Sequence, residues 1–128
     1  MRTERIFANR YWNDTGIALV KGKRYRLSVR PGEGEPLCDK GFKARSIEGE
    51  DWGLLHRVAS VVRAKRMDGE KWFALIGTVN REHPWRIVDG AIVSAPAGGP
   101  LLCFFNDVQV EAFYHNNSGW VVLDVEAM

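Results

Sequence analysis

The chain has 128 residues, of which 45% are hydrophobic and 27% charged. This length and composition fit one globular domain with a buried core and exclude a low-complexity chain. The net charge is only +2, but residues 1–66 hold 15 Lys/Arg against 8 Asp/Glu, and residues 67–128 hold 3 against 8. The basic half would suit an acidic partner. No nucleic-acid-binding motif accompanies it, however, so charges on solvent-facing strands are the simpler interpretation.

The first twelve residues, "MRTERIFANRYW", lack the apolar region of a secretory signal. No run approaches the roughly 20 apolar residues of a membrane-spanning helix. We therefore expect a protein of the cytoplasm, or one exported without a signal peptide, with no membrane or nucleic-acid partner. Two cysteines are too few for a disulfide scaffold. Cys103 lies in the apolar run "PLLCFF" and Cys38 in the turn-like "PLCDKG", and a bridge between them stays open.

Alternation with a period of two dominates the chain and predicts strands. In "RYRLSVR" (24–30), Tyr25, Leu27 and Val29 should face the core. The run "PLLCFF" (100–105) is apolar on both faces, as a central strand can be, and "GWVVLDVE" (119–126) alternates again. The other expected strands are 17–20, 70–80 and 86–95, with 54–67 read as a strand more readily than as a helix.

Turn signals separate these runs. Lys21-Gly22 follows the first strand, and the Asp-Gly at 68–69 is a strong hairpin signal. No convincing capped amphipathic helix is present. The pattern predicts an all-β fold, an antiparallel β-sandwich or barrel, formed by residues 1–128 as one domain.

The stretch "FNDVQVEAFYHNNSGW" (105–120) gathers oxygen-bearing side chains between two apolar runs. Calcium takes about 6–8 oxygen ligands from carboxylates, amides and backbone carbonyls. Asp107, Asn116 and Asn117 are ligands of this kind, and Glu111 would add charge. The alternative is a plain turn in which the two Asn adopt left-handed backbone angles and cap their own amides.

Other site chemistries find little support. The three His share no metal-binding spacing, and no phosphate loop, nucleophile elbow or dinucleotide fingerprint is present. We therefore expect no enzyme. Trp12, Trp52 and Trp85 fall in loop-like contexts, where they either pack against the sandwich edge or stack on a ligand. Trp72 and Trp120 fall in predicted strands and are expected in the core.

The segment "FNDVQVEAFYHNNSGWVVLDV" resembles the C-terminal part of the calcium-dependent galactophilic lectins of the PA-IL type. In those lectins Asn-Asp-Val opens the loop and Tyr-x-Asn-Asn-Ser-Gly closes it, as do residues 106–108 and 114–119 here. "WNDTGIALVKGKRYRLSV" (12–29) is similar to their early strand pair and "ALIG" (74–77) to a central strand. The resemblance implies a jelly-roll-like, galactose-binding-domain-like sandwich.

In that family calcium sits in the loop, and two vicinal sugar hydroxyls complete its coordination. The resemblance implies that Asp107, Asn116 and Asn117 supply side-chain oxygens and that Phe113 supplies its carbonyl. A further carbonyl would come from the loop "RPGEGEPLCDKG" (30–41). The present loop is two residues longer, around Val110 and Glu111.

The lectins hold the sugar's primary hydroxyl with a His and a Gln, and the counterpart here is "EGEDWGLL" (48–55). The His is missing, and Trp52 stands in the place of the Gln. Stacking of Trp52 on a sugar would suit a different glycan. Two functions follow. One is a calcium-dependent carbohydrate-binding module. The other is the same fold with a degenerate sugar site that serves as an interaction or structural module, with homo-oligomerisation through edge strands or an exposed Trp85 region.

Overall fold

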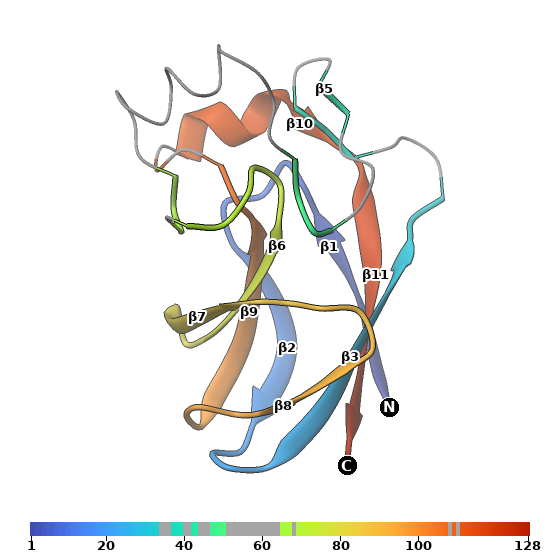
Figure 1. Ribbon diagram of the computed structural model, residues 1–128, viewed down its shortest axis with the longest axis vertical. Coiled ribbons are helices and arrows are strands. Elements are labelled where there is room, and N and C mark those ends of the chain that lie inside the picture. The colour runs from blue at the N-terminus through green and yellow to red at the C-terminus, as the bar shows by residue number, and fades with distance from the viewer. Residues whose placement is uncertain are drawn as a thin grey trace.

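The computed structural model describes residues 1–33, 37–39, 42–43, 47–50, 65–67, 69–107, 109 and 111–128. Two four-stranded antiparallel sheets face each other, and a small three-stranded sheet closes one end (Figure 1). The chain termini lie together at the opposite end, because the first strand pairs antiparallel with the last. The predicted all-β antiparallel sandwich is therefore confirmed.

The first sheet has the order β1-β11-β3-β8. Its strands are β1 (Arg2–Phe7), β11 (Trp120–Ala127), β3 (Arg24–Pro31) and β8 (Ala91–Ser94). The predicted alternation is confirmed, since Tyr25 and Leu27 of β3 are buried, as are Val121, Leu123 and Val125 of β11. Strand β1 was not predicted, because only its Ile6 is fully buried and charged or polar residues make up most of the rest.

The second sheet has the order β2-β9-β6-β7. Its strands are β2 (Asn13–Leu19), β9 (Gly99–Phe105), β6 (Leu75–Val79) and β7 (Glu82–Arg86). Residues 101–105 of β9 are buried on both faces, as predicted for a central strand. The main core fills the space between the two sheets. A second cluster of Ala74, Ile76 and Phe104 packs with Trp12 and Met67.

The end of the sandwich opposite the termini carries the short strands β4 (Cys38–Asp39), β5 (Phe42–Lys43) and β10 (Asn117–Ser118). The 3₁₀ helix η1 (Glu111–Asn116) precedes β10. Asn117 pairs with Asp39 and Ser118 with Cys38. The segment that follows β3 is therefore held beside the end of the 105–120 loop.

The strands predicted at 70–80 and 86–95 have other bounds in the structure. The run at 70–80 becomes strand only at Leu75, since Phe73 has a φ of 60° that breaks the extended chain. Trp72, expected within that strand, is buried and reaches only an isolated bridge to Glu50. The run at 86–95 divides at Asp89-Gly90, where Gly90 has a φ of 80°. Most of the expected 54–67 strand and Asp68 lie outside the described residues.

Trp85 was predicted in a loop, and that prediction is wrong: it lies in β7, directly opposite Gly77 of β6. A Cβ at Gly77 would lie only 2.9 Å from the Trp85 ring, so the glycine leaves room for the indole. Trp85 therefore packs against the main core. Its role is structural, which was one of the two alternatives for the loop tryptophans.

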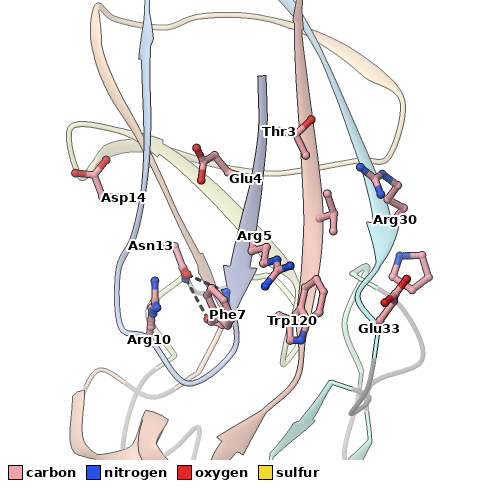
Figure 2. Close-up of a pocket in the computed structure, with 12 residues that line it drawn as sticks. Thr3, Glu4, Arg5, Phe7, Arg10, Asn13, Asp14, Arg30, Glu33 and Trp120 are labelled. Atoms are coloured by element: carbon pink, nitrogen blue, oxygen red, sulfur yellow. Dashed lines mark hydrogen bonds between the residues drawn. The ribbon is translucent and has the colours of Figure 1, made fainter. Parts of the chain in front are cut away.

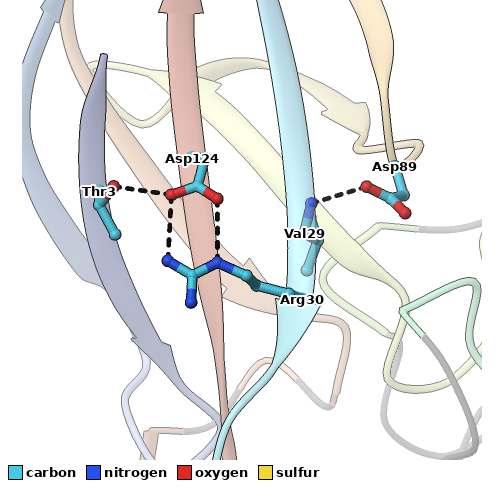
Figure 3. Close-up of polar contacts among 5 residues, drawn as sticks. All are labelled: Thr3, Val29, Arg30, Asp89 and Asp124. Carbon is cyan, nitrogen blue, oxygen red and sulfur yellow. Dashed lines mark hydrogen bonds and ion pairs between the residues drawn. The ribbon is translucent and has the colours of Figure 1, made fainter.

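An ionic network ties the strands of the first sheet together on the outer face (Figure 3). Arg30 of β3 donates through Nε to Asp124 Oδ2 at 3.1 Å, and the Thr3 hydroxyl of β1 donates to Asp124 Oδ1 at 2.7 Å. Asp89 accepts from the amide of Val29 at 2.7 Å, which fastens β3 to the turn before β8. The hydrogen bond from Arg30, and then that from Thr3, lowers the pKa of Asp124.

We predict that Asp124→Asn lowers the free energy of unfolding by about 1 kcal/mol at neutral pH, as expected for a partly exposed pair. Because folding lowers the pKa of Asp124, its carboxylate contributes fully to the free energy of unfolding at pH values above the pKa of the unfolded chain. This contribution disappears as the pH falls through the pKa of the folded protein. Urea unfolding of both proteins from pH 7 to pH 2.5 would measure this. A difference that stays constant over that range would contradict the prediction.

A second prediction concerns the two thiols, neither of which forms a disulfide. Cys103 has no exposed surface, and burial raises its pKa to about 12. Because the thiolate is the reactive form, Cys103 should resist thiol reagents in the native protein, whereas half-buried Cys38 should react. Counting of modified thiols by mass spectrometry, before and after denaturation, checks this. Native labelling of Cys103 as fast as Cys38 would contradict it.

Candidate metal site

The candidate site is built on the connection between β9 and β10. β9 ends at Phe105, Asn106 and Asp107 follow directly, and η1 returns the chain to Asn117. The two ends of the loop therefore meet at the same end of the sandwich (Figure 1). The meeting of the ends was the main geometric requirement of the predicted cage.

Asn106 has no exposed surface and holds the loop against the segment before β6. Its side-chain Oδ1 accepts from the amide of Met67 at 3.0 Å. Its Nδ2 donates to three carbonyls, those of Met67, Glu70 and Lys71, at 3.0, 3.3 and 3.1 Å. Its backbone also pairs with Phe73 and Ala74. Asn106 is thus a structural clamp, and Asp107 is the member of this pair that was predicted as a ligand.

Arg66 fastens the same loop from the other side. Its backbone amide donates to the Asp107 carbonyl at 2.9 Å, and its guanidinium donates to the Tyr11 carbonyl and to the Tyr114 hydroxyl. The guanidinium carbon lies 3.6 Å from the ring centroids of both Tyr11 and Phe104. Such stacked cations contribute more when they are shielded from water. Arg66 therefore holds the backbone of Asp107 in place.

Tyr114 completes this support from within η1. It is fully buried, and its hydroxyl donates to the Phe105 carbonyl at 2.7 Å. Burial raises the pKa of Tyr114 well above its ordinary range, so the hydroxyl stays a donor. Helix η1 is therefore fastened to the end of β9. Tyr114, which makes this contact, lies within four positions of the predicted ligands Phe113, Asn116 and Asn117.

Asp107 and Asn117 meet in the structure, as the sequence predicted. Asp107 is 4% exposed and Asn117 5%. Asn117 Nδ2 donates to Asp107 Oδ2 at 3.0 Å and to the Ala8 carbonyl at 3.2 Å. These two acceptors fix the orientation of the amide, because an exchange of its ends would set oxygen against oxygen.

The amide oxygen of Asn117 is the unusual atom of the site. With Nδ2 committed, Oδ1 is buried and has no hydrogen-bond partner among the described residues. Buried polar atoms are nearly always satisfied, and one left unpaired costs about 1–3 kcal/mol. A lone acceptor beside a carboxylate is the chemistry that a hard cation needs. Trp85 Nε1, the other such atom, is a donor and cannot ligate one.

The remaining predicted site residues are less closely gathered. Asn116 ends η1 and is exposed, as is Glu111 at its start. Phe113 is the third of the six residues of η1. Trp52 and the inserted Val110 lie outside the described residues. No group of three or more His, Cys, Asp or Glu side chains lies together within the described ranges.

Sequence reasoning missed two contributors to the site. Ala8 accepts from Asn117 across 109 positions of sequence, and Arg66 reaches Tyr114 across 48. Strand β4, by contrast, belongs to the loop from which a further carbonyl was expected. No local pattern marks such contacts, because they depend on how the two sheets close at this end.

The fold is an antiparallel β-sandwich whose loops pair at one end. Among solved structures, the chain matches one described as "EclA N-terminal domain; PllA-like lectin" with a TM-score of 0.57 and 21% identity. The match covers 100% of this chain and 97% of that chain. The predicted resemblance to a lectin is therefore confirmed at the level of the fold. No protein-family model and no curated protein matches the sequence, and no described helix is long and apolar enough to cross a membrane.

We predict that Asn106→Ala lowers the free energy of unfolding by about 2–4 kcal/mol, because it leaves several buried backbone groups without their partner. Gln109→Ala is the matched control. It removes one exposed hydrogen bond, from the Gln109 side-chain amide to the Lys65 carbonyl at 3.1 Å. It should change the free energy of unfolding by less than about 0.5 kcal/mol. Denaturant unfolding measures both. Equal losses in the two variants would show that Asn106 is not the clamp.

Proposed function

We propose that this chain is a non-catalytic carbohydrate-binding module whose sugar site is built on a calcium ion. Asp107, Asn116 and Asn117 would hold the ion through side-chain oxygens, and Phe113 through its carbonyl. When bound, calcium supplies open coordination positions that accept the oxygens of sugar hydroxyls. The protein's part is to hold the ligands in place, and no bond of the sugar is broken.

One observation carries the proposal: the buried, unpartnered Oδ1 of Asn117 beside the carboxylate of Asp107. Two hydrogen bonds from Nδ2 hold the amide in this orientation. A rotation of the amide that gave Oδ1 a partner would break both of them. A cation would satisfy this atom and neutralise the carboxylate together. The pairing of Asn117–Ser118 with Cys38–Asp39 supports the expected contribution from the loop after β3.

The charge of the site sets the expected affinity. Asp107 is the single carboxylate among the proposed ligands, and amides and carbonyls neutralise calcium poorly. Dissociation constants of calcium sites rise as ligand charge falls, to about 10⁻⁴–10⁻³ M in extracellular modules. We therefore expect weak calcium binding that bound sugar strengthens, because each ligand favours the form that holds the other.

The sugar specificity is proposed to differ from that of the galactophilic lectins. The chain lacks their His, and Trp52 replaces their Gln in the alignment of "EGEDWGLL". A lost hydrogen bond to the primary hydroxyl costs about 1–3 kcal/mol. Stacking on the Trp52 ring would instead favour glycans with an apolar ring face. A panel of methyl glycosides, titrated with calcium present and then with EDTA, distinguishes these cases.

We predict that calcium raises the melting temperature of the protein and that Asp107→Asn removes this rise. At calcium concentrations of about 10–100 times the dissociation constant, binding stabilises the folded state by about 1.4–2.7 kcal/mol. For a domain of this size that is a rise of several degrees. Differential scanning calorimetry with calcium and with EDTA measures it, and isothermal titration gives the stoichiometry.

Asp124→Asn is the matched control for that experiment. It makes the same change of charge on β11, outside the proposed ligand set. It should keep the calcium-dependent rise although its own melting temperature is lower. A wild-type protein that neither melts higher in calcium nor releases heat with it would refute the proposed metal site.

The second candidate is a module of the same fold without a sugar site, which binds a protein partner or a second copy of itself. The hydrogen bond from Asn117 to Asp107 favours it, because the two groups already satisfy each other in part. The exposure of Asn116 points the same way. A melting temperature unaffected by calcium, together with a dimer in light scattering, would support this candidate over the first.

A further inference from the structure

A groove of about 620 Å³ is lined by residues of β1, β11 and the end of β3 in the first sheet and by the start of β2 in the second (Figure 2). This volume is in the range of small-molecule sites. Its lining is mostly polar and holds three arginines, three carboxylates and two aromatic rings. The arginines are Arg5, Arg10 and Arg30, and the rings are those of Phe7 and Trp120.

Two of the arginines are stacked on the two rings. The Arg5 guanidinium lies 4.6 Å from the Trp120 ring centroid, and that of Arg10 lies 4.2 Å from the Phe7 ring centroid. The rings themselves are 6.3 Å apart, because Phe7 and Trp120 are partners in the β1–β11 ladder. Each guanidinium group is therefore stacked on its own ring, and the two rings are neighbours in the β1–β11 ladder (Figure 2).

These two cations have no carboxylate partner among the described residues. Arg30, by contrast, is paired with Asp124, and Glu4 lies 4.0 Å from Arg2. A guanidinium stacked on a ring keeps its edge N–H donors directed sideways, in a fork that fits a carboxylate or sulfate. Stacking also reduces the side-chain entropy lost on binding, so the pair is organised in advance.

The carboxylates of the groove restrict the ligand. Glu4, Asp14 and Glu33 would repel a polyanion such as nucleic acid. They are, however, good acceptors for hydroxyl groups. One anionic group for the arginines and several hydroxyls for the acids describe a sugar acid rather than a phosphate-rich polymer.

We propose that this groove is a second ligand site, which binds a pyranose that carries a carboxylate, with Arg5 and Arg10 as the cationic groups that attract the anion. The ring hydroxyls meet the acidic lining of the groove, and Phe7, Trp120 and Val122 provide its apolar contact. None of these residues belongs to the proposed calcium ligands. Binding here is therefore independent of calcium.

The test is titration of the ¹⁵N-labelled protein, in EDTA, with methyl glucuronide followed by amide and indole NMR shifts. We expect saturable shifts in β1 and β11 and at the Trp120 indole. Arg5→Gln with Arg10→Gln should raise the dissociation constant at least about tenfold, since two charge-assisted hydrogen bonds are lost. Both side chains are exposed, so the variant should fold, and its spectrum shows whether it does.

Four comparisons make the result decisive. Arg24→Gln removes an exposed arginine of β3 outside the groove and should leave binding unchanged. Methyl glucoside, the neutral parent sugar, should not bind, and inorganic sulfate should bind more weakly than the glucuronide. A sulfated galactoside distinguishes a general anionic sugar site from one for carboxylates. Equal binding of the neutral sugar or of sulfate alone, or no loss in the double variant, would overturn the proposal, whatever calcium does.

Discussion

The end of the sandwich that carries the candidate site depends on the buried side chain of Asn106. A single amide accepts one backbone N–H and donates to three carbonyls of residues 67–71. That segment precedes β6, and without this side chain several of its backbone groups would lose their partner. Phe73, which follows the segment, is buried at a φ of 60°. A strained, bulky residue persists only where its surroundings hold it, and the backbone of Asn106 bonds to its amide.

The adjacent Asn and Asp therefore divide two tasks. Asn106 is buried, and its side-chain and backbone polar atoms all form hydrogen bonds within the fold. The carboxylate of Asp107 instead accepts a hydrogen bond from Asn117. Because Arg66 fixes Asp107 through its carbonyl, the carboxylate does not have to hold the loop in place alone. The two groups that the proposed metal site uses here are the Asp107 carboxylate, which accepts from Asn117, and the unpaired amide oxygen of Asn117.

The sequence predicted the strands whose apolar residues form a clear pattern. β3 and β11 show alternation and β9 a continuous apolar run, and all three were found with nearly correct bounds. β1 has few buried positions, and Trp85 was misplaced because its burial depends on Gly77 across the ladder. For the site, the residue types marked Asp107 and Asn117, and their meeting followed from loop closure. The roles of Asn106 and Arg66 were not predictable, since their partners are set by contacts distant in the chain.

The contact between Gly32, directly after β3, and the backbone of Trp120 links the candidate metal site to the arginine groove. Gly32 donates to the Trp120 carbonyl at 3.1 Å, and a Cβ there would lie 2.4 Å from that same oxygen. Only glycine allows this approach. It brings the chain after β3 close enough for β4 to pair with β10, and it places the end of β3 beside the Trp120 ring. The backbone at Gly32 therefore helps to form both surfaces, although they share no proposed ligand residue.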